Sequence, residues 1–251
     1  KSTIRAVAVI TNAEIIKDKI SFFYSVSKDR IFVINQQPSL SISKFDKIDK
    51  ILLEKFKKLY SLPQKYIFYP AMYLPHKNHK YVIDSIKILK SEYKINLCAV
   101  FCGRGSGYLK KIKKYVYEQK QNENIFFLDF VKNEYLPYLY LNSLALVMPT
   151  YSGPTNIPPL EAFKMEIPVL YSDIHNIKEV YKEAVYYIDP FDPQSMAKGI
   201  RDIIENKNLK NQLIDNGKKL LNSINVDEEF KQFFQIIKKR KKIKETWEFD
   251  N

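Results

Sequence analysis

Cysteine, histidine and long apolar runs are all scarce in this chain of 251 residues, which has two cysteines and three histidines. Both cysteines, Cys98 and Cys102, fall in one apolar stretch that is typical of a strand. Residues four apart on a strand share a face and lie about 13 Å apart, at about 3.3 Å per residue. That separation excludes a disulfide between them in an unbent strand. We therefore expect two small buried thiols.

Other features that would mark particular classes of protein are also missing. The longest apolar runs, such as Leu144–Met148, are far too short to cross a bilayer. His76 and His79 are spaced like metal ligands, but no Cys, Asp or Glu nearby completes a set, so we expect no bound metal. The sequence has no D-x-D metal motif, nucleophile elbow, P-loop or internal repeat. No basic-then-apolar leader opens the chain, and we expect the protein in the cytoplasm.

The charge is strongly positive, at +13 with a pI near 9.4. Candidate partners are nucleic acid, an anionic membrane face and phosphorylated substrates, and the alternative is that the lysines only solvate the surface. Nucleic acid is disfavoured because the 16 Phe and 18 Tyr fall mostly at core spacing and no RNP-like motif occurs. The basic run Lys238–Lys244 could rest on the inner face of a membrane, at about 1 kcal/mol per basic residue.

Apolar runs alternate with helix-spaced stretches along most of the chain. The strands expected after residue 60 are 66–70, 97–102, 125–130, 144–148, 168–171 and 185–188. Strands separated by helices of 10–15 residues indicate βαβ units, so we predict an α/β fold with a Rossmann-like parallel sheet flanked by helices. Ahead of it we expect strands at Ile4–Thr11 and Arg30–Ile34 and a polar linker at Ser41–Asp49. Ligands of such sheets bind where the strands have their carboxyl ends.

The loop after Leu144–Met148 has the residues for an anion site. Prolines 158 and 159 suit the first turn of a helix, and the free amides of Thr155, Asn156 and Ile157 would lie at its positive end. Glu161 lies about one turn further along, where accepting hydrogen bonds from two ribose hydroxyls would fit. The alternative is a Glu favoured only by the helix dipole, by ~0.3–1 kcal/mol.

Two further loops follow strands on the same predicted edge. Lys77, after the strand at 66–70, could neutralise a diphosphate, although most lysines are simply solvated. The turn Gly103-Arg104-Gly105 would let the backbone approach a ligand closely, or it is a plain tight turn.

Together these loops resemble family 4 of the retaining glycosyltransferases, which have the GT-B fold of two Rossmann-like domains with the active site between them. The resemblance covers about Leu59 to Ile224. Its most specific part is the segment Gly153-Pro154-Thr155-Asn156-Ile157-Pro158-Pro159-Leu160-Glu161-Ala162, followed by Ile167-Pro168-Val169 and Ser172-Asp173.

The resemblance implies a role for each matching residue. Glu161 would bind the ribose hydroxyls of a nucleotide sugar, the backbone of residues 155–157 would hold the phosphates, and Lys77 would compensate the leaving diphosphate. Gly103 and Gly105 would border the nucleotide together with Arg104, and the loop at Phe130-Val131 would line the base. No cofactor or metal is implied beyond the donor itself.

The sequence departs from this family in three places. Gly153 stands where the family has a second glutamate that contacts the donor sugar, and Met72 stands where it has an arginine. Both positions are kept as candidate donor contacts. Most of the N-terminal acceptor domain is absent. We therefore expect residues 1–45 to be the tail of that domain with a linker, 46–225 the nucleotide-sugar-binding domain, and 226–251 a crossover helix with a basic tail.

The implied reaction transfers a hexose from a nucleoside-diphosphate sugar to a glycan or lipid-linked acceptor in surface polysaccharide biosynthesis. Lys77 and Glu161 are the expected catalytic-site residues, and the chain is expected to be truncated. The alternatives are a non-catalytic module that binds nucleotide sugars and a basic nucleic-acid-binding protein.

Overall fold

The computed structural model describes residues 2–105, 107–153 and 157–249, and it divides the chain into two compact units. The larger unit is Pro38–Leu221, and the smaller one combines Lys1–Gln37 with Asn222–Asn251. The candidate site residues described below all belong to the larger unit.

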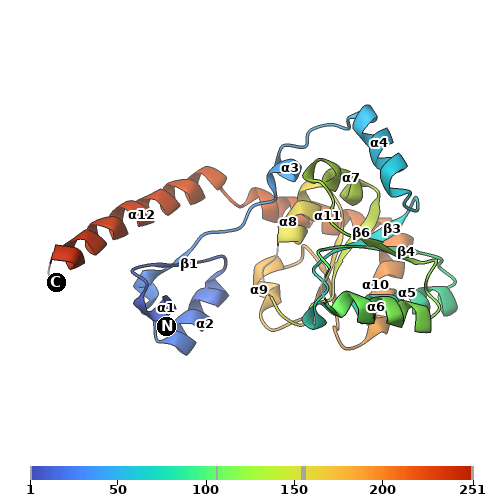
Figure 1. The fold of residues 1–251 in the computed structure, drawn as a ribbon, viewed down its shortest axis with the longest axis horizontal. Helices are drawn as coiled ribbons and strands as arrows, with labels where there is room; N and C mark the ends of the chain where they lie inside the picture. The colour runs from blue at the N-terminus through green and yellow to red at the C-terminus, as the bar shows by residue number, and fades with distance from the viewer. Residues whose placement is uncertain (1, 106, 154–156, 250–251) are drawn as a thin grey trace. The chain divides into compact units, whose positions relative to one another are not determined.

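A six-stranded sheet with all neighbours parallel forms the centre of the larger unit (Figure 1). Its order is β5-β4-β3-β6-β7-β8. The strands are β3 Tyr66–Pro70, β4 Cys98–Cys102, β5 Ile125–Leu128, β6 Ser143–Met148, β7 Val169–Ser172 and β8 Tyr186–Ile188. The prediction of a Rossmann-like α/β fold is confirmed.

The central strands are buried along nearly their whole length, which explains their unbroken apolar sequences. Tyr66 to Tyr69 of β3 have no exposed surface, and Phe68 pairs with Val100 of β4 and with Leu146 of β6. Each of the four central strands, β4, β3, β6 and β7, is therefore covered on both faces.

Helices cover the sheet on two sides (Figure 1): α5, α6 and α10 gather on one, and α7, α8 and α11 on the other. A short helix, α3, packs against α7 and α8. The elements of this unit are α3 Leu40–Ser43, α4 Lys50–Tyr60, η2 Pro75–Lys77, α5 His79–Ser91, α6 Gly107–Glu118, η3 Asn133–Tyr135, α7 Leu136–Leu141, α8 Ile157–Lys164, α9 Ile177–Tyr181, α10 Pro193–Glu205 and α11 Lys207–Asn222.

The smaller unit is built on two parallel strands, β1 Val9–Thr11 and β2 Ile31–Val33. Its helices are α1 Ser2–Arg5, α2 Glu14–Tyr24, η1 Lys28–Arg30 and α12 Val226–Phe249. The Asn35 side chain donates to Glu229 at 2.6 Å and ties α12 to the segment after β2.

Three expectations from the sequence need correction. The strand predicted at Ile4–Thr11 is only three residues long because β2 offers no longer partner, and α1 occupies its start. The predicted linker at Ser41–Asp49 begins inside α3, whose first turn is closed by bonds from the amides of Ile42 and Ser43 to the Ser39 carbonyl. The two cysteines form no disulfide, but both are half-buried rather than buried, since β4 ends at them.

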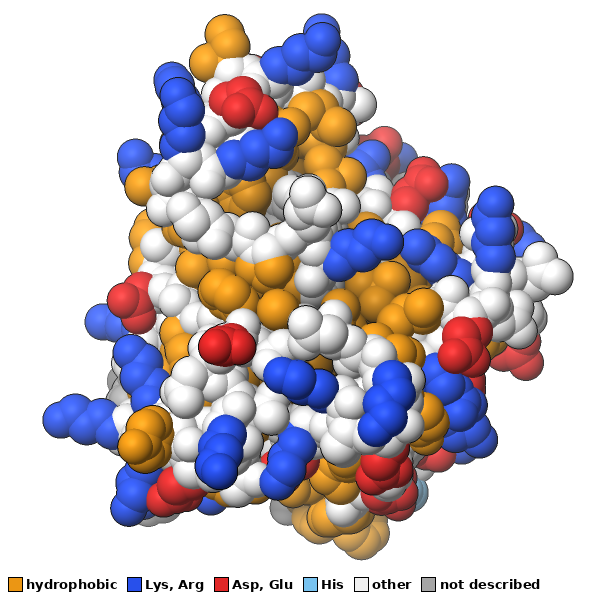
Figure 2. Space-filling view, turned by 90° about the vertical axis from the view of Figure 1, so that its right-hand side faces the viewer, with side chains coloured by type: hydrophobic (Ala, Val, Ile, Leu, Met, Phe, Trp, Pro, Cys, Tyr) orange, Lys and Arg blue, Asp and Glu red, His pale blue; other side chains and the backbone are white. Residues whose placement is uncertain are grey.

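Charged side chains are dispersed on the face of the molecule that Figure 2 shows. Figure 2 shows lysine and arginine side chains spread over one face and interspersed with acidic and apolar ones. Within the described part of the chain, no helix has the long, weakly charged apolar run that crossing a membrane requires.

Candidate functional site

The strand order creates a switch point at the centre of the larger sheet. From β3 the chain moves outward through β4 and β5, then returns to the other side of β3 and continues through β6, β7 and β8. The loops that follow β3 and β6 therefore leave the carboxyl edge of the sheet in opposite directions. Ligands of open α/β sheets bind in the crevice at such a point.

Close backbone contacts hold three loops together at this edge. The amide of Tyr151, after β6, donates to the carbonyl of His76, after β3, at 2.9 Å. A Cβ added to Gly103, after β4, would lie 2.1 Å from the carbonyl oxygen of Ala71. The turn after β4 thus packs directly on the loop after β3, and only glycine fits there without a backbone shift.

Lys77 ends the short helix η2 in the loop after β3. Tyr69 fixes its backbone, because the Tyr69 hydroxyl donates to the Lys77 carbonyl at 2.5 Å. The next residue, Asn78, has a left-handed backbone (φ 56°) and donates from its side chain to the Pro190 carbonyl at 3.0 Å. The Lys77 side chain is half-buried, and burial lowers the pKa of its amine. No salt bridge to it is found among the described residues.

Glu161 lies in the second turn of α8 and is only 5% exposed. The Tyr140 hydroxyl donates to its Oε2 at 2.7 Å, and the Ser39 amide donates to its Oε1 at 3.3 Å. Burial, reinforced by the neighbouring Glu161 charge, raises the pKa of Tyr140 well above its usual value. The carboxylate therefore has a hydrogen-bond donor on each oxygen and no cationic neighbour among its hydrogen-bond partners.

Six further predicted residues lie in the loops after β3, β4 and β5 and differ in exposure. Met72 and Phe130 are 49% and 81% exposed, whereas Val131 is buried. Arg104 and Gly105 are exposed, and Gly103 is half-buried. These six sit after β3, β4 and β5, at one side of the switch point.

The loop after β6 and the start of α8 lie on the other side of the switch point. Gly153 has φ 97°, a conformation that favours glycine, and its carbonyl accepts a 2.6 Å hydrogen bond from Tyr171. Ile157 is the first residue of α8 and is 39% exposed. Thr155 and Asn156 lie outside the described residues.

Sequence reasoning missed four residues at this edge. Tyr140 and Ser39 hold Glu161, and they are too distant from it in sequence for a motif to reveal. Tyr151 and Phe191 stack with their ring centroids 5.3 Å apart and are 43% and 80% exposed, so they form an open aromatic pair. The only sequence feature that could have indicated this pair is an aromatic residue in each of the loops after β6 and β8.

His79 lies in a buried aromatic cluster. Its ring is fully buried between Tyr69, Tyr73 and Phe101, at centroid distances of 4.8, 4.9 and 5.1 Å. Burial lowers its pKa to about 4, so the ring is neutral at pH 7. No cluster of three His, Cys, Asp or Glu side chains occurs in the part of the chain that the structure describes.

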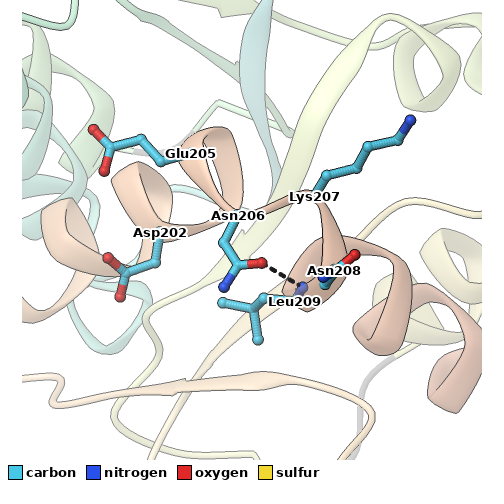
Figure 3. Close-up of a pocket in the computed structure, with 6 residues that line it drawn as sticks. All are labelled: Asp202, Glu205, Asn206, Lys207, Asn208 and Leu209. Carbon is cyan, nitrogen blue, oxygen red and sulfur yellow. Dashed lines mark hydrogen bonds between the residues drawn. The ribbon is translucent and has the colours of Figure 1, made fainter.

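A separate hollow lies where α10 meets α11 (Figure 3). It is lined by Asp202, Glu205, Asn206, Lys207, Asn208 and Leu209. The Asn206 side chain accepts a 3.0 Å hydrogen bond from the Leu209 amide and so caps α11. Because α10 runs back from the carboxyl edge after β8, this hollow lies toward the opposite end of the sheet.

Comparison with known families decides the class of protein. The family described as "Glycosyl transferases group 1" matches residues 51–220, more than half of the chain. The chain belongs to the group 1 glycosyltransferases. The match includes β3 to β8 and every loop of the candidate site.

One curated relative is the O-antigen chain mannosyltransferase RfbU of Salmonella typhimurium, which is 30% identical over 195 residues. The alignment covers 78% of this chain and 50% of RfbU, so the chain spans about half the length of that relative.

Solved structures share the fold. A Rickettsia africae glycosyltransferase superposes with a TM-score of 0.80 at 16% identity, covering 93% of this chain and 63% of the other. The Anabaena protein Alr3699/HepE, crystallised in complex with UDP, gives a TM-score of 0.77 at 14% identity, covering 95% of this chain and 65% of the other. The α/β architecture thus matches GT-B glycosyltransferases.

Proposed function

We propose that this chain is the nucleotide-sugar-binding half of a retaining glycosyltransferase of family 4. It binds a nucleoside-diphosphate sugar at the carboxyl edge of the larger sheet. The complete protein transfers the hexose to a glycan or lipid-linked acceptor in surface polysaccharide biosynthesis. The observation that carries this proposal is the buried carboxylate of Glu161, placed one turn inside α8 beside the switch point.

The residues at this edge suit the parts of such a donor. Glu161 accepts hydrogen bonds from ribose hydroxyls, and the positive end of α8 receives the diphosphate. Lys77 offsets the charge that grows on the departing diphosphate, since it is half-buried and has no acidic partner among the described residues. Positioning and charge stabilisation supply the catalysis without a metal ion.

The relatives suggest the chemistry of the donor. RfbU is named as a mannosyltransferase of the O-antigen chain, which supports mannose as the hexose. The Anabaena structure contains UDP, which keeps a uridine donor in the comparison. The base of the donor is therefore left open, and the test includes nucleoside diphosphates of guanine, uracil and thymine.

The test is calorimetric titration of this chain with GDP, UDP and dTDP. We expect micromolar binding of one nucleotide and at least a tenfold weaker affinity in Glu161→Ala, because a charged hydrogen bond is worth about 1.5–3 kcal/mol. Glu166→Ala is the matched control, since Glu166 is an exposed carboxylate that pairs with Lys218 at 2.9 Å and with no other cation among the described residues. Absence of binding by any of the three nucleotides would overturn the proposal for this chain.

A further inference from the structure

We propose that Tyr140 is a positioning residue for ribose recognition, and that the Ser39 amide is its counterpart on the other carboxylate oxygen. Together they fix the Glu161 side chain before the nucleotide arrives. This inference rests on the proposed function and adds to it the groups that make Glu161 selective for ribose.

The Tyr140 hydroxyl has little freedom to serve another acceptor. The side chain is fully buried, and its ring packs edge-to-face on Phe68 of β3 with centroids 5.0 Å apart. The hydroxyl donates to Oε2 of Glu161 at 2.7 Å. Burial raises the pKa of this phenol, so Tyr140 is a protonated donor at neutral pH.

The hydrogen-bond capacity of Glu161 matches a ribose diol. An ionised carboxylate has about four acceptor positions, two on each oxygen. Tyr140 uses one on Oε2 and the Ser39 amide uses one on Oε1. Among the described residues no other donor is found on Glu161, so one position on each oxygen is left, which is what two neighbouring hydroxyls of a ribose require.

The two donors also lock the orientation of the carboxylate. A free glutamate side chain loses rotamer freedom when a ligand orders it, and that loss opposes binding. Here α3, which follows Ser39, packs against both α7 and α8, the helices that carry Tyr140 and Glu161. The three elements therefore order the carboxylate through folding instead of through ligand binding.

The first test compares Tyr140→Phe with the wild type, using GDP and UDP alongside their 2′-deoxy analogues. The wild type should prefer the ribonucleotide, and Tyr140→Phe should lose roughly fivefold of this preference, as expected for one hydrogen bond. The matched control is Tyr66→Phe. Tyr66 is equally buried, but its hydroxyl donates to the Leu139 carbonyl at 2.8 Å and does not contact Glu161. Its removal should leave the preference unchanged.

A second pair of variants tests the other oxygen. Ser39→Pro deletes the amide donor, and the Ser39 φ of −56° suits proline. Ser39→Ala removes the hydroxyl and keeps the amide. We expect Ser39→Pro alone to reduce the preference for ribose over 2′-deoxyribose. This pair also decides the matter if Tyr140→Phe does not fold.

The outcomes separate the two proposals. A wild-type chain that binds no nucleotide overturns the proposed function and this inference with it. A wild-type chain that prefers ribose, with Tyr140→Phe and Ser39→Pro retaining the full preference, overturns only the positioning role. A loss of preference that Tyr66→Phe shares equally would show a general packing effect and would also overturn it.

Discussion

The two ends of the six-stranded sheet use polar side chains differently. At the hollow between α10 and α11, Asp202 accepts bonds from Arg201 at 2.6 Å and from Tyr186 at 2.9 Å. At the carboxyl edge, Glu161 is more deeply buried but keeps acceptor capacity, and Lys77 has no ionic partner among the described residues.

This difference separates a structural use of charge from a functional one. At the hollow, Asp202 and Glu205 both pair with Arg201, and the Asn206 side-chain oxygen already caps α11. At the carboxyl edge a cation and an anion are held by the backbone and by neutral donors, which leaves both able to act on a ligand. A concave surface alone is therefore a poor guide to the site.

The largest expected effect comes from crowding the contact between two carboxyl-edge loops. Gly103→Ala should lower the free energy of unfolding by about 3 kcal/mol, because its Cβ would meet the Ala71 carbonyl and overpacking costs up to that amount. Thermal denaturation measures the change. In the control Gly105→Ala, the new Cβ meets only the Leu109 side chain at 3.6 Å, so stability should stay nearly constant. Equal stability of the two variants would refute the close contact.

Removing Lys77, which has no ionic partner among the described residues, should be the next largest effect. Lys77→Met should weaken binding of the preferred nucleoside diphosphate roughly 10- to 100-fold, as for loss of a charged hydrogen bond. Titration calorimetry measures this affinity. Lys207→Met removes an exposed lysine from the hollow and should leave the affinity unchanged. If both variants bind alike, the two ends of the sheet do not differ in the way described.

The pH dependence of nucleotide binding is a second test of the role of Lys77 at the carboxyl edge. Burial lowers the pKa of Lys77, so its charge in the free protein is present at low pH and is lost as the pH rises through that lowered value. Affinity for the diphosphate should therefore decline on the alkaline side earlier than for a lysine with the ordinary pKa of about 10.4. Titrations at increasing pH measure the decline. In Lys77→Arg this alkaline decline in affinity should disappear, because arginine stays charged.

The smallest effect is expected at the hollow. Burial alone would raise the pKa of Asp202, but the bonds from Arg201 and Tyr186 outweigh it and lower the value. A lowered carboxyl pKa adds stability above its unfolded pKa of about 3.9, and this is lost as the pH falls through the folded value. Asp202→Asn should therefore cost at most about 1 kcal/mol at pH 7, with a smaller cost below about pH 4. Denaturant unfolding at both pH values checks this, and nucleotide affinity should not change.

Sequence patterns were sufficient to predict most strands and helices of the larger unit, because each strand is a short, strongly apolar run. The predicted strand at 66–70 coincides with β3, and the helix expected near Pro158 begins at Ile157. The four-residue α3 was missed, since a single turn has no period to detect and depends on packing against α7 and α8.

The site was only partly accessible to the same reasoning. Glu161 and Lys77 belong to recognisable loops, and topology alone indicates that these loops share one edge. The partners of Glu161 were not predictable, because Ser39 and Tyr140 come from two other elements and meet it only in the folded chain. Whether the candidate residues bind a nucleotide stays a prediction.

The central position of β3 has a consequence for folding. β3 pairs with β6, and Phe68 of β3 lies opposite Leu146 of β6. During synthesis this pairing cannot form until Leu146 has been translated. Until then one edge of a wholly apolar strand has no partner, and long-range parallel pairing is slow and prone to aggregation. We infer that a nascent chain halted before β6 exposes this edge. Chaperone demand should therefore peak in that interval of translation and fall once β6 has joined the sheet.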